Sequence, residues 1–180
     1  MQLLCNDLVN ELFISIINLV RYCCLEEQTN DQNSLFDQLS AHMNNMGRET
    51  VLFNCLMIPD DLVKLAVVQC IFVVPLDEFE SDEISQLAKI ISSTSNIGKG
   101  KTELIVAVIF WIFCKLVIGD IDVMEGCQVF QVKFGEKMLG EALNILQKNS
   151  SRVVEEDAED MEKYALSISI LCFIKNASYS

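Results

Sequence analysis

The stretch "LIVAVIFWIFCKLVI", from Leu104 to Ile118, is the most apolar part of the chain and constrains how the rest must fold. It holds 15 residues and one charged side chain, Lys115, whereas an α-helix needs roughly 20 apolar residues to cross a bilayer. Thr102 and Gly119 flank it, and these residue types typically cap and end helices. We therefore expect a buried central helix, with Trp111 in the core and not at an interface.

The scarcity of turn-forming residues around this stretch predicts an all-α fold. The 180 residues include 7 Gly and 2 Pro, too few for the many tight turns of an all-β fold. Apolar residues recur at spacings of three and four, as in Leu8, Leu12 and Ile16, which indicates amphipathic helices. Helices are expected over residues 3–26, 34–47, 49–58, 60–74, 81–91, 102–119, 120–148 and, opened by Ser150 or Ser151, up to residue 174. We expect one all-helical domain over residues 1–180.

Residues 120–148 are the one segment where a strand competes with a helix. Phe130, Val132 and Phe134 alternate with polar residues, as they would in a half-buried strand. However, Phe130, Phe134 and Met138 also fall at positions i, i+4 and i+8 of a helix. A lone strand would have no partner to pair with, so we predict a helix.

The net charge restricts the kinds of partner that the chain can bind. It is -13 at pH 7, with a sequence pI near 4.4. Recognition of phosphates in nucleic acids or anionic membranes depends on clustered Lys and Arg, which this balance opposes. The expected partner is therefore another protein with a basic or neutral surface, and neither a nucleic acid nor a membrane span is expected.

The cysteines point to a reducing compartment. Most of the eight lie inside apolar helical runs, where a thiol behaves as a small core residue. They are Cys5, Cys23, Cys24, Cys55, Cys70, Cys114, Cys127 and Cys172. We expect no signal peptide, because Asn6, Asp7 and Glu11 interrupt the first apolar stretch. A cytoplasmic or nuclear location follows from unpaired thiols.

The sequence offers no constellation of residues that predicts catalysis. His42 is the single histidine, and neither a CxxC pair nor an HExxH motif occurs, so the common zinc sites are not expected. The acidic groups at residues 77–83 and 155–162 are interpreted as helix N-terminal charge and solvated faces. We predict no catalytic, cofactor-binding or metal-binding residues, no cofactor and no enzymatic activity; partner-binding residues are not predicted.

One motif resembles a nucleotide-binding loop. The string "NIGKGKT", from Asn96 to Thr102, ends as a P-loop does, but Ser95 occupies the position of its first glycine. The element before it is predicted to be a helix, whereas a P-loop follows a buried strand. We therefore interpret the string as a flexible, basic loop between helices.

The chain contains a weak internal repeat. Laying the helix at 60–74 on the helix at 102–118 with a shift of 41 residues pairs Val63 with Leu104, Ala66 with Ala107, Val67 with Val108, Val68 with Ile109, Ile71 with Ile112 and Phe72 with Phe113. A further shift of 58 carries Ala107, Val108, Ile112, Phe113 and Cys114 onto Ala165, Leu166, Ile170, Leu171 and Cys172. Periods near 41 are typical of helical solenoid repeats.

The segment "PDDLVKLAVVQCIFVV", from Pro59 to Val74, resembles the inner helix of an armadillo or HEAT repeat. The resemblance covers mainly residues 49–120. It implies a superhelix of stacked helical hairpins, such as one end of a longer protein would form, and a role as a protein-interaction scaffold or adaptor. The chain lacks the inner-helix Asn with which armadillo proteins often hold a peptide backbone, which puts that binding mode in doubt.

A compact helical bundle is the alternative architecture. In it, residues 104–118 would form the hydrophobic centre, as in helical regulators of the Bcl-2 type. The two architectures differ in their contacts, because solenoid units contact only neighbouring units, whereas a bundle brings the first helix against the sixth or the last.

Overall fold

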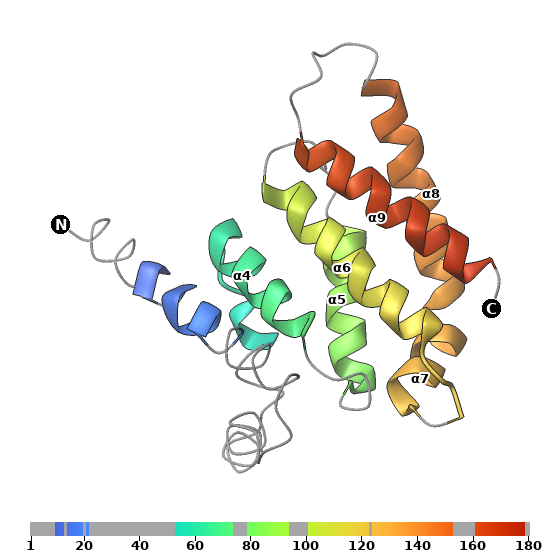
Figure 1. The fold of residues 1–180 in the computed structure, drawn as a ribbon, viewed down its shortest axis with the longest axis horizontal. Coiled ribbons are helices and arrows are strands. Elements are labelled where there is room, and N and C mark those ends of the chain that lie inside the picture. Colours follow the sequence, from blue (N-terminus) through green and yellow to red (C-terminus); the bar gives the residue numbers. More distant parts are fainter. Residues whose placement is uncertain are drawn as a thin grey trace. The chain divides into compact units, whose positions relative to one another are not determined.

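The computed structural model describes residues 10–12, 14–19, 21, 53–73, 79–93, 101–122, 124–152 and 161–178. The chain divides into two compact units, residues 1–74 and 75–180, which are described separately (Figure 1). The described residues form helices, turns and loops without a strand, which confirms the all-α class. That the whole chain is one domain stays a prediction.

In the first unit, the aspartate after Pro59 begins a helix. Helix α4 spans Asp61–Ile71, and Asp60 Oδ1 accepts hydrogen bonds from the backbone N–H groups of Leu62 and Val63 at 2.8 and 3.0 Å. This is the N-cap arrangement expected of an aspartate. The helix begins at Asp61, one residue after the predicted start, and ends at Ile71 instead of continuing to residue 74.

A helical segment near the N-terminus lies along α4. Asn10 Nδ2 donates to Asp60 Oδ2 at 2.9 Å, and an Arg21 Nη donates to Gln69 Oε1 at 3.1 Å. Between these anchors Ile17 is buried. The described part of the predicted helix 3–26 is therefore helical, while its ends and the whole predicted helix 34–47 lie outside the described residues.

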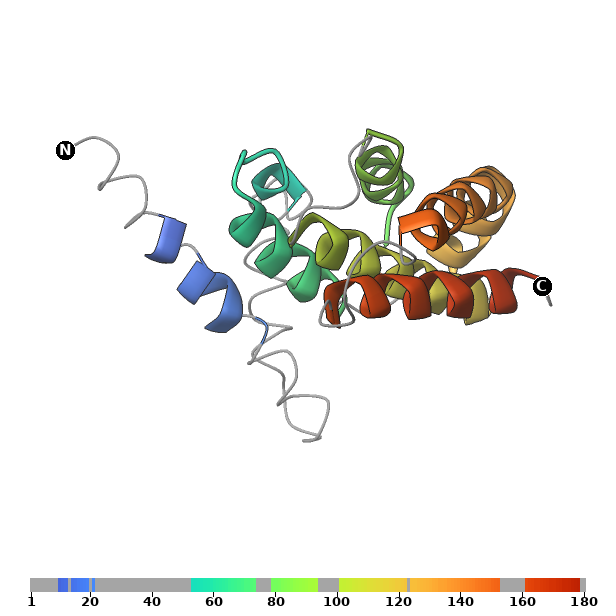
Figure 2. The same ribbon diagram turned by 90° about the horizontal axis from the view of Figure 1, so that it is seen from above.

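The second unit arranges its longer helices in two layers. Its helices are α5 (Ser81–Ser93), α6 (Lys101–Ile118), α7 (Glu125–Lys133), α8 (Gly135–Arg152) and α9 (Met161–Ala177). Figure 2 shows α5 and α8 in one layer and α6 and α9 in the other. Helices α6 and α9 make the most extensive contact, and both run in the same direction (Figures 1 and 2).

The ambiguous segment 120–148 is helical from Glu125 onward and contains a break, so the predicted start at residue 120 is too early. The Phe134 N–H donates to the Phe130 carbonyl at 2.8 Å, and the Met138 N–H donates to the Phe134 carbonyl at 2.9 Å. Phe134 itself leaves the helical conformation, with φ −122° and ψ −24°, and separates α7 from α8. These local hydrogen bonds replace the strand pairing that the alternation suggested.

The predicted boundary at Ser150 or Ser151 is wrong. Helix α8 continues to Arg152, and α9 begins at Met161. The buried apolar row of α8 ends at Ile145, but helix hydrogen bonding extends one residue at a time through the polar residues that follow. A serine there lies in the last turns of a helix and does not cap the next one.

Four phenylalanines from three helices form the core of the second unit. Phe110 and Phe113 of α6, Phe130 of α7 and Phe173 of α9 are all fully buried. Phe113 lies between the others, with ring centroids 4.7 Å from Phe130 and 6.2 Å from Phe110. The Phe173 ring is 5.4 Å from Phe110. Such ring pairs add stability to that which comes from burying their apolar area. Here they connect α6 and α9 to α7.

Candidate interaction surface

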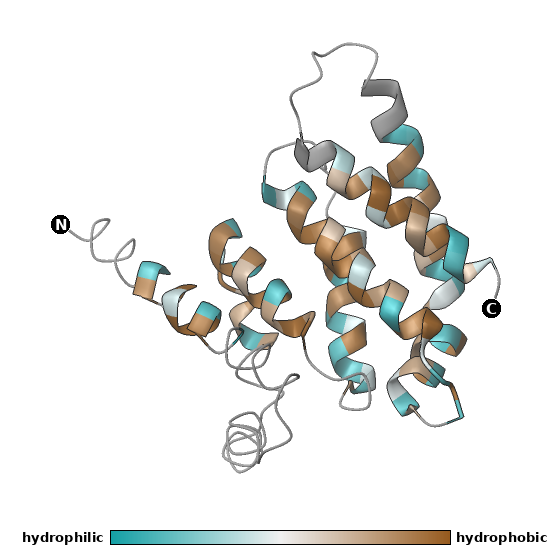
Figure 3. Ribbon diagram, viewed as in Figure 1, coloured by the Kyte–Doolittle hydropathy of each residue, from teal (hydrophilic) through white to brown (hydrophobic). Residues whose placement is uncertain are grey.

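One row of α6 is left open, although its other sides are buried. Five positions at spacings of four and three are exposed or half-buried: Leu104, Val108, Trp111, Lys115 and Ile118. Trp111 is 37% exposed and Ile118 is 68% exposed. The helix is apolar along most of its length (Figure 3), so its open row is largely apolar as well.

The prediction that Trp111 lies in the core is wrong. The residue was expected to be covered because its neighbours in the sequence are apolar, yet it faces the same side as Lys115, one turn further along. A lysine on an apolar helix keeps its ammonium group in water, so its side of the helix tends to face solvent. Lys115 was the signal that could have placed Trp111 correctly.

Helix α9 matches part of the burial pattern of α6 at a shift of 57 residues. Fully or almost fully buried positions correspond: Ile109, Ile112, Phe113 and Leu116 in α6 match Leu166, Ser169, Ile170 and Phe173 in α9. The shift of 58 taken from the sequence would instead place buried Phe113 on exposed Leu171. The shift of 58 was chosen from residue types. On a helix that is apolar on every side, residue types do not distinguish buried positions from exposed ones.

With the corrected shift, α9 has an open row that corresponds to that of α6. Its described members are Ala165, Ile168, Cys172 and Lys175, none of which is buried. Ile168, which matches Trp111, is 54% exposed. We call the two rows together the open face. Because α6 and α9 are adjacent and run in the same direction, their rows run side by side.

Two cysteines lie where the open face meets the α6–α9 interface. Cys114 is buried, and its Sγ lies 4.0 Å from the Ser169 carbonyl oxygen. Burial, with a smaller contribution from Cys172, raises the pKa of Cys114 to about 11, against a lowering contribution from Asn176. A thiol with so high a pKa is almost entirely protonated near neutral pH and is a weak nucleophile.

The described cysteines are free thiols, as expected of core residues. Cys55, Cys70, Cys114 and Cys127 are buried, and Cys172 is half-buried. Desolvation raises the pKa of Cys55 and of Cys127 as well. The prediction for Cys5, Cys23 and Cys24 lies outside the described residues.

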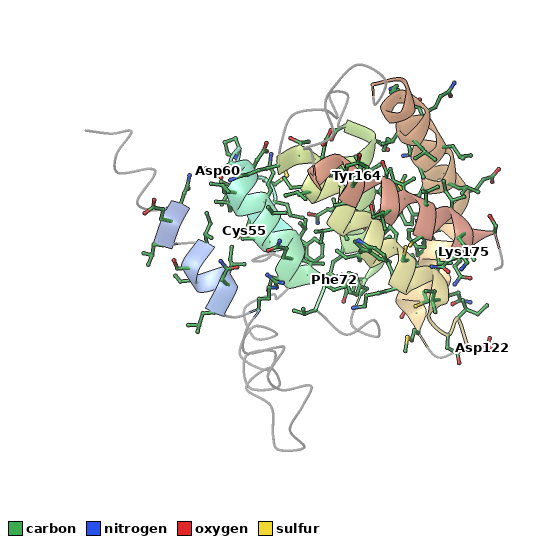
Figure 4. All side chains as sticks on the ribbon, turned by 45° about the horizontal axis from the view of Figure 1, so that its top comes forward. Cys55, Asp60, Phe72, Asp122, Tyr164 and Lys175 are labelled. Carbon is green, nitrogen blue, oxygen red and sulfur yellow. The ribbon has the colours of Figure 1, made fainter. Side chains whose placement is uncertain are left out.

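One end of the open face carries positive charge. Lys115 and Lys175 occupy the last turns of α6 and α9, respectively, and Figure 4 places Lys175 and Tyr164 towards opposite ends of α9. Desolvation by burial lowers the pKa of Lys115. The open face is therefore apolar over most of its length and cationic at one end, in a chain whose net charge is -13.

The first unit has an exposed apolar row of its own. Leu12, Ile16 and Leu19 lie on the N-terminal helical segment at spacings of four and three, and each is more than half exposed. The side of this segment that carries Asn10, Ile17 and Arg21 rests on α4. It is a second apolar surface.

The motifs that resembled catalytic sites gain no support. Lys101 and Thr102 form the first turn of α6, so Thr102 does not precede the helix as a cap; the rest of the P-loop-like string and His42 lie outside the described residues. Of the acidic groups, Asp82 and Glu83 stand in the first turn of α5, as predicted, but Glu83 is buried and not part of a solvated face. The segment 153–160 is not described.

Two absences concern the part of the chain that the structure describes. Among these residues, no group of three or more His, Cys, Asp or Glu side chains could hold a metal ion. No described helix has the length and apolar character needed to span a membrane.

Comparison with protein-family models, with curated proteins and with solved structures finds no match to this chain.

Proposed function

We propose that the chain is a non-enzymatic protein–protein interaction scaffold built on helical repeats, and that it works in the cytoplasm or nucleus. The observation that carries this proposal is the equivalence of α6 and α9. At a shift of 57 residues four buried positions of α6 fall on buried positions of α9, and matching rows stay open, with Trp111 on one and Ile168 on the other. The open face is the proposed contact with a partner protein.

The contacts between helices support a repeat arrangement in the second unit. Helix α6 contacts α9, and α5 contacts α8, so each helix of one pair meets its counterpart in the other pair. Helix α7 connects the two pairs along the chain. Neighbouring repeats of a solenoid contact each other in this way, which favours an armadillo or HEAT-like stack.

The compact regulator of the Bcl-2 type is the second candidate. It is favoured by the position of α6, which contacts α5, α7 and α9 and buries most of its residues. Its open row argues against a fully central helix, because a bundle centre is covered on every side.

The open face is suited to binding because it leaves large apolar side chains in water. Fully burying a large apolar side chain is favourable by roughly 1.5–3 kcal/mol, and residues such as Trp contribute disproportionately to protein interfaces. The partner is expected to have a neutral or basic surface overall, given the net charge of -13.

Affinity capture from the native cell, read by quantitative mass spectrometry, tests this proposal. The bait is the full chain, as wild type, as the double variant Trp111→Gln with Ile168→Gln, or as the control Leu143→Gln. Leu143 lies on α8 and is exposed to a similar degree as Ile168, but it is outside the open face. We expect a specific set of proteins with the wild type and the control, reduced at least about tenfold with the double variant. Equal capture by all three baits, with equal thermal midpoints, would contradict the proposal.

A further inference from the structure

The side of α6 that α9 covers has a counterpart on α9 itself. Four residues of α6 at spacings of three, four and three are buried on this side: Ala107, Phe110, Cys114 and Val117. Two of them contact α9 directly. The ring centroids of Phe110 and Phe173 are 5.4 Å apart, and Cys114 Sγ lies 4.0 Å from the Ser169 carbonyl oxygen.

The same shift of 57 residues carries this row onto Tyr164, Ser167, Leu171 and Ile174. We call these four residues the outer edge of α9. Tyr164 and Leu171 are each 53% exposed, and Ser167 and Ile174 are half-buried. The row that is buried in α6 is therefore largely uncovered in α9, although it keeps the same spacing and remains mostly apolar.

We propose that the outer edge of α9 binds a helix of a partner protein, which lies along α9 in the direction in which α9 lies along α6. This inference rests on the proposed function and adds the kind of partner and its orientation. The continuity of the α6–α9 interface carries it, since an edge equivalent to a buried one is built for helix packing. A helix face that meets only water is polar, whereas the outer edge of α9 is mostly apolar.

The side chains of the edge specify what the partner helix must present. In the α6–α9 contact, Phe110 of α6 packs against Phe173 of α9. On the outer edge, the position that corresponds to Phe110 is the smaller Ser167. A partner therefore needs a large apolar side chain there to fill the space. At the position of Cys114 the edge has the larger Leu171, which calls for a small residue in the partner. Close packing makes this complementarity of size a determinant of specificity.

A second copy of this chain is a poorer occupant than another protein. Each copy carries a net charge of -13, so two copies repel each other over the whole surface. An extended peptide is also a poorer occupant, because side chains of α9 at spacings of three, four and three match another helix in period.

Photo-crosslinking at single positions in the full chain tests the proposal. The photoreactive residue p-benzoylphenylalanine replaces Tyr164 or Leu171, and Leu143 on α8 serves as the control position. The chain is irradiated in its native cell and the crosslinked peptides are sequenced. Tyr164 and Leu171 are seven residues apart, or two helical turns. We expect both to link to one segment of one other protein, at sites about seven residues apart and in the same order along the two chains.

Four results would overturn the proposal. They are links to a second copy, links to this chain itself, sites in reversed order or at the closer spacing of an extended segment, and an absence of links beyond the Leu143 control. A variant provides an independent readout. Leu171→Glu should lower capture of the linked protein at least about tenfold, because it places a charge in an apolar contact, while Leu143→Glu and the thermal midpoint should not change.

The variants separate the two proposals. If the double variant Trp111→Gln with Ile168→Gln loses partners while Leu171→Glu keeps all of them, the open face binds and the outer-edge proposal is overturned. If Leu171→Glu loses the helix-linked protein and the double variant loses nothing, the outer edge is supported and the open-face contact is contradicted.

Discussion

Helices α6 and α9 are both rich in apolar residues, and they differ in how much of them the fold covers. Both are apolar around most of their circumference (Figure 3). In α6 only one row remains open, whereas α9 leaves Tyr164, Ile168 and Leu171 more than half exposed. A helix that is apolar on every side is expected to be buried on every side. Its sequence does not say which neighbouring element buries each side.

The difference follows from the number of neighbours. Among the described helices of the second unit, α6 is contacted extensively by α9 and also by α5 and α7, whereas α9 packs against α6 and α8. The uncovered side of α9 is where the proposed partner helix would pack. The predictions below test this contrast, beginning with the largest effect.

Truncating the ring at the centre of α6 should destabilise the second unit most. Phe113→Ala removes a buried ring that contacts Phe110, Phe130 and Phe173, and such changes cost about 3–5 kcal/mol. Urea denaturation followed by fluorescence of Trp111, the single tryptophan of the chain, measures the loss. A loss below about 1 kcal/mol would mean that α6 is not the core helix.

High pH should weaken the contact between α6 and α9 through Cys114. Its pKa is raised from 9.0 to about 11 in the folded chain, so the unfolded thiol ionises first. The free energy of unfolding that this residue contributes is fully present below pH 9 and is lost as the pH rises to about 11. Cys114→Ala should therefore show a shallower fall in stability between pH 9 and 11. An equally steep fall in the variant would contradict the burial of this thiol.

The two thiols at the α6–α9 interface should differ in their rate of alkylation. Cys172 of α9 is half-buried and Cys114 of α6 is buried, so iodoacetamide should modify Cys172 first in the native chain. Peptide mass spectrometry over a time course gives both rates. Equal rates would show that α9 covers α6 less firmly than the contacts indicate.

The smallest effect is expected in the fluorescence of Trp111. Because this side chain is 37% exposed, acrylamide should quench its emission to a degree between those of a buried indole and of free tryptophan. Quenching as weak as that of a buried indole would place Trp111 in the core, and the open face would lose its largest side chain.

Local structure was predictable from the sequence where one residue type has a clear preference. Asp60 after Pro59 marks the start of α4, and the apolar run from Leu104 to Ile118 marks α6; both are confirmed. Local features suffice for such predictions, because an aspartate at the N-cap accepts hydrogen bonds from backbone N–H groups and a long apolar run needs burial.

The candidate surface was not predictable in the same way. The burial of Trp111 and the shift between α6 and α9 depend on which sides of an apolar helix meet a neighbour, and that depends on tertiary packing. Residue type alone placed Trp111 in the core and set the shift one residue too far. The end of α8 was missed for a related reason, since polar residues after Ile145 continue the helix without contributing to the core.

The contrast between the two sides of α9 is tested most directly by one matched pair of variants. Ile168 and Ile170 are the same residue type, two positions apart on one helix; Ile168 is 54% exposed and Ile170 is fully buried. Urea denaturation of Ile168→Ala and Ile170→Ala compares them with identical chemistry. The structure predicts a loss of about 2–5 kcal/mol for Ile170→Ala and less than about 1 kcal/mol for Ile168→Ala. Equal losses would contradict it, because the open face of α9, to which Ile168 belongs, would then be needed for folding and could not be offered to a partner.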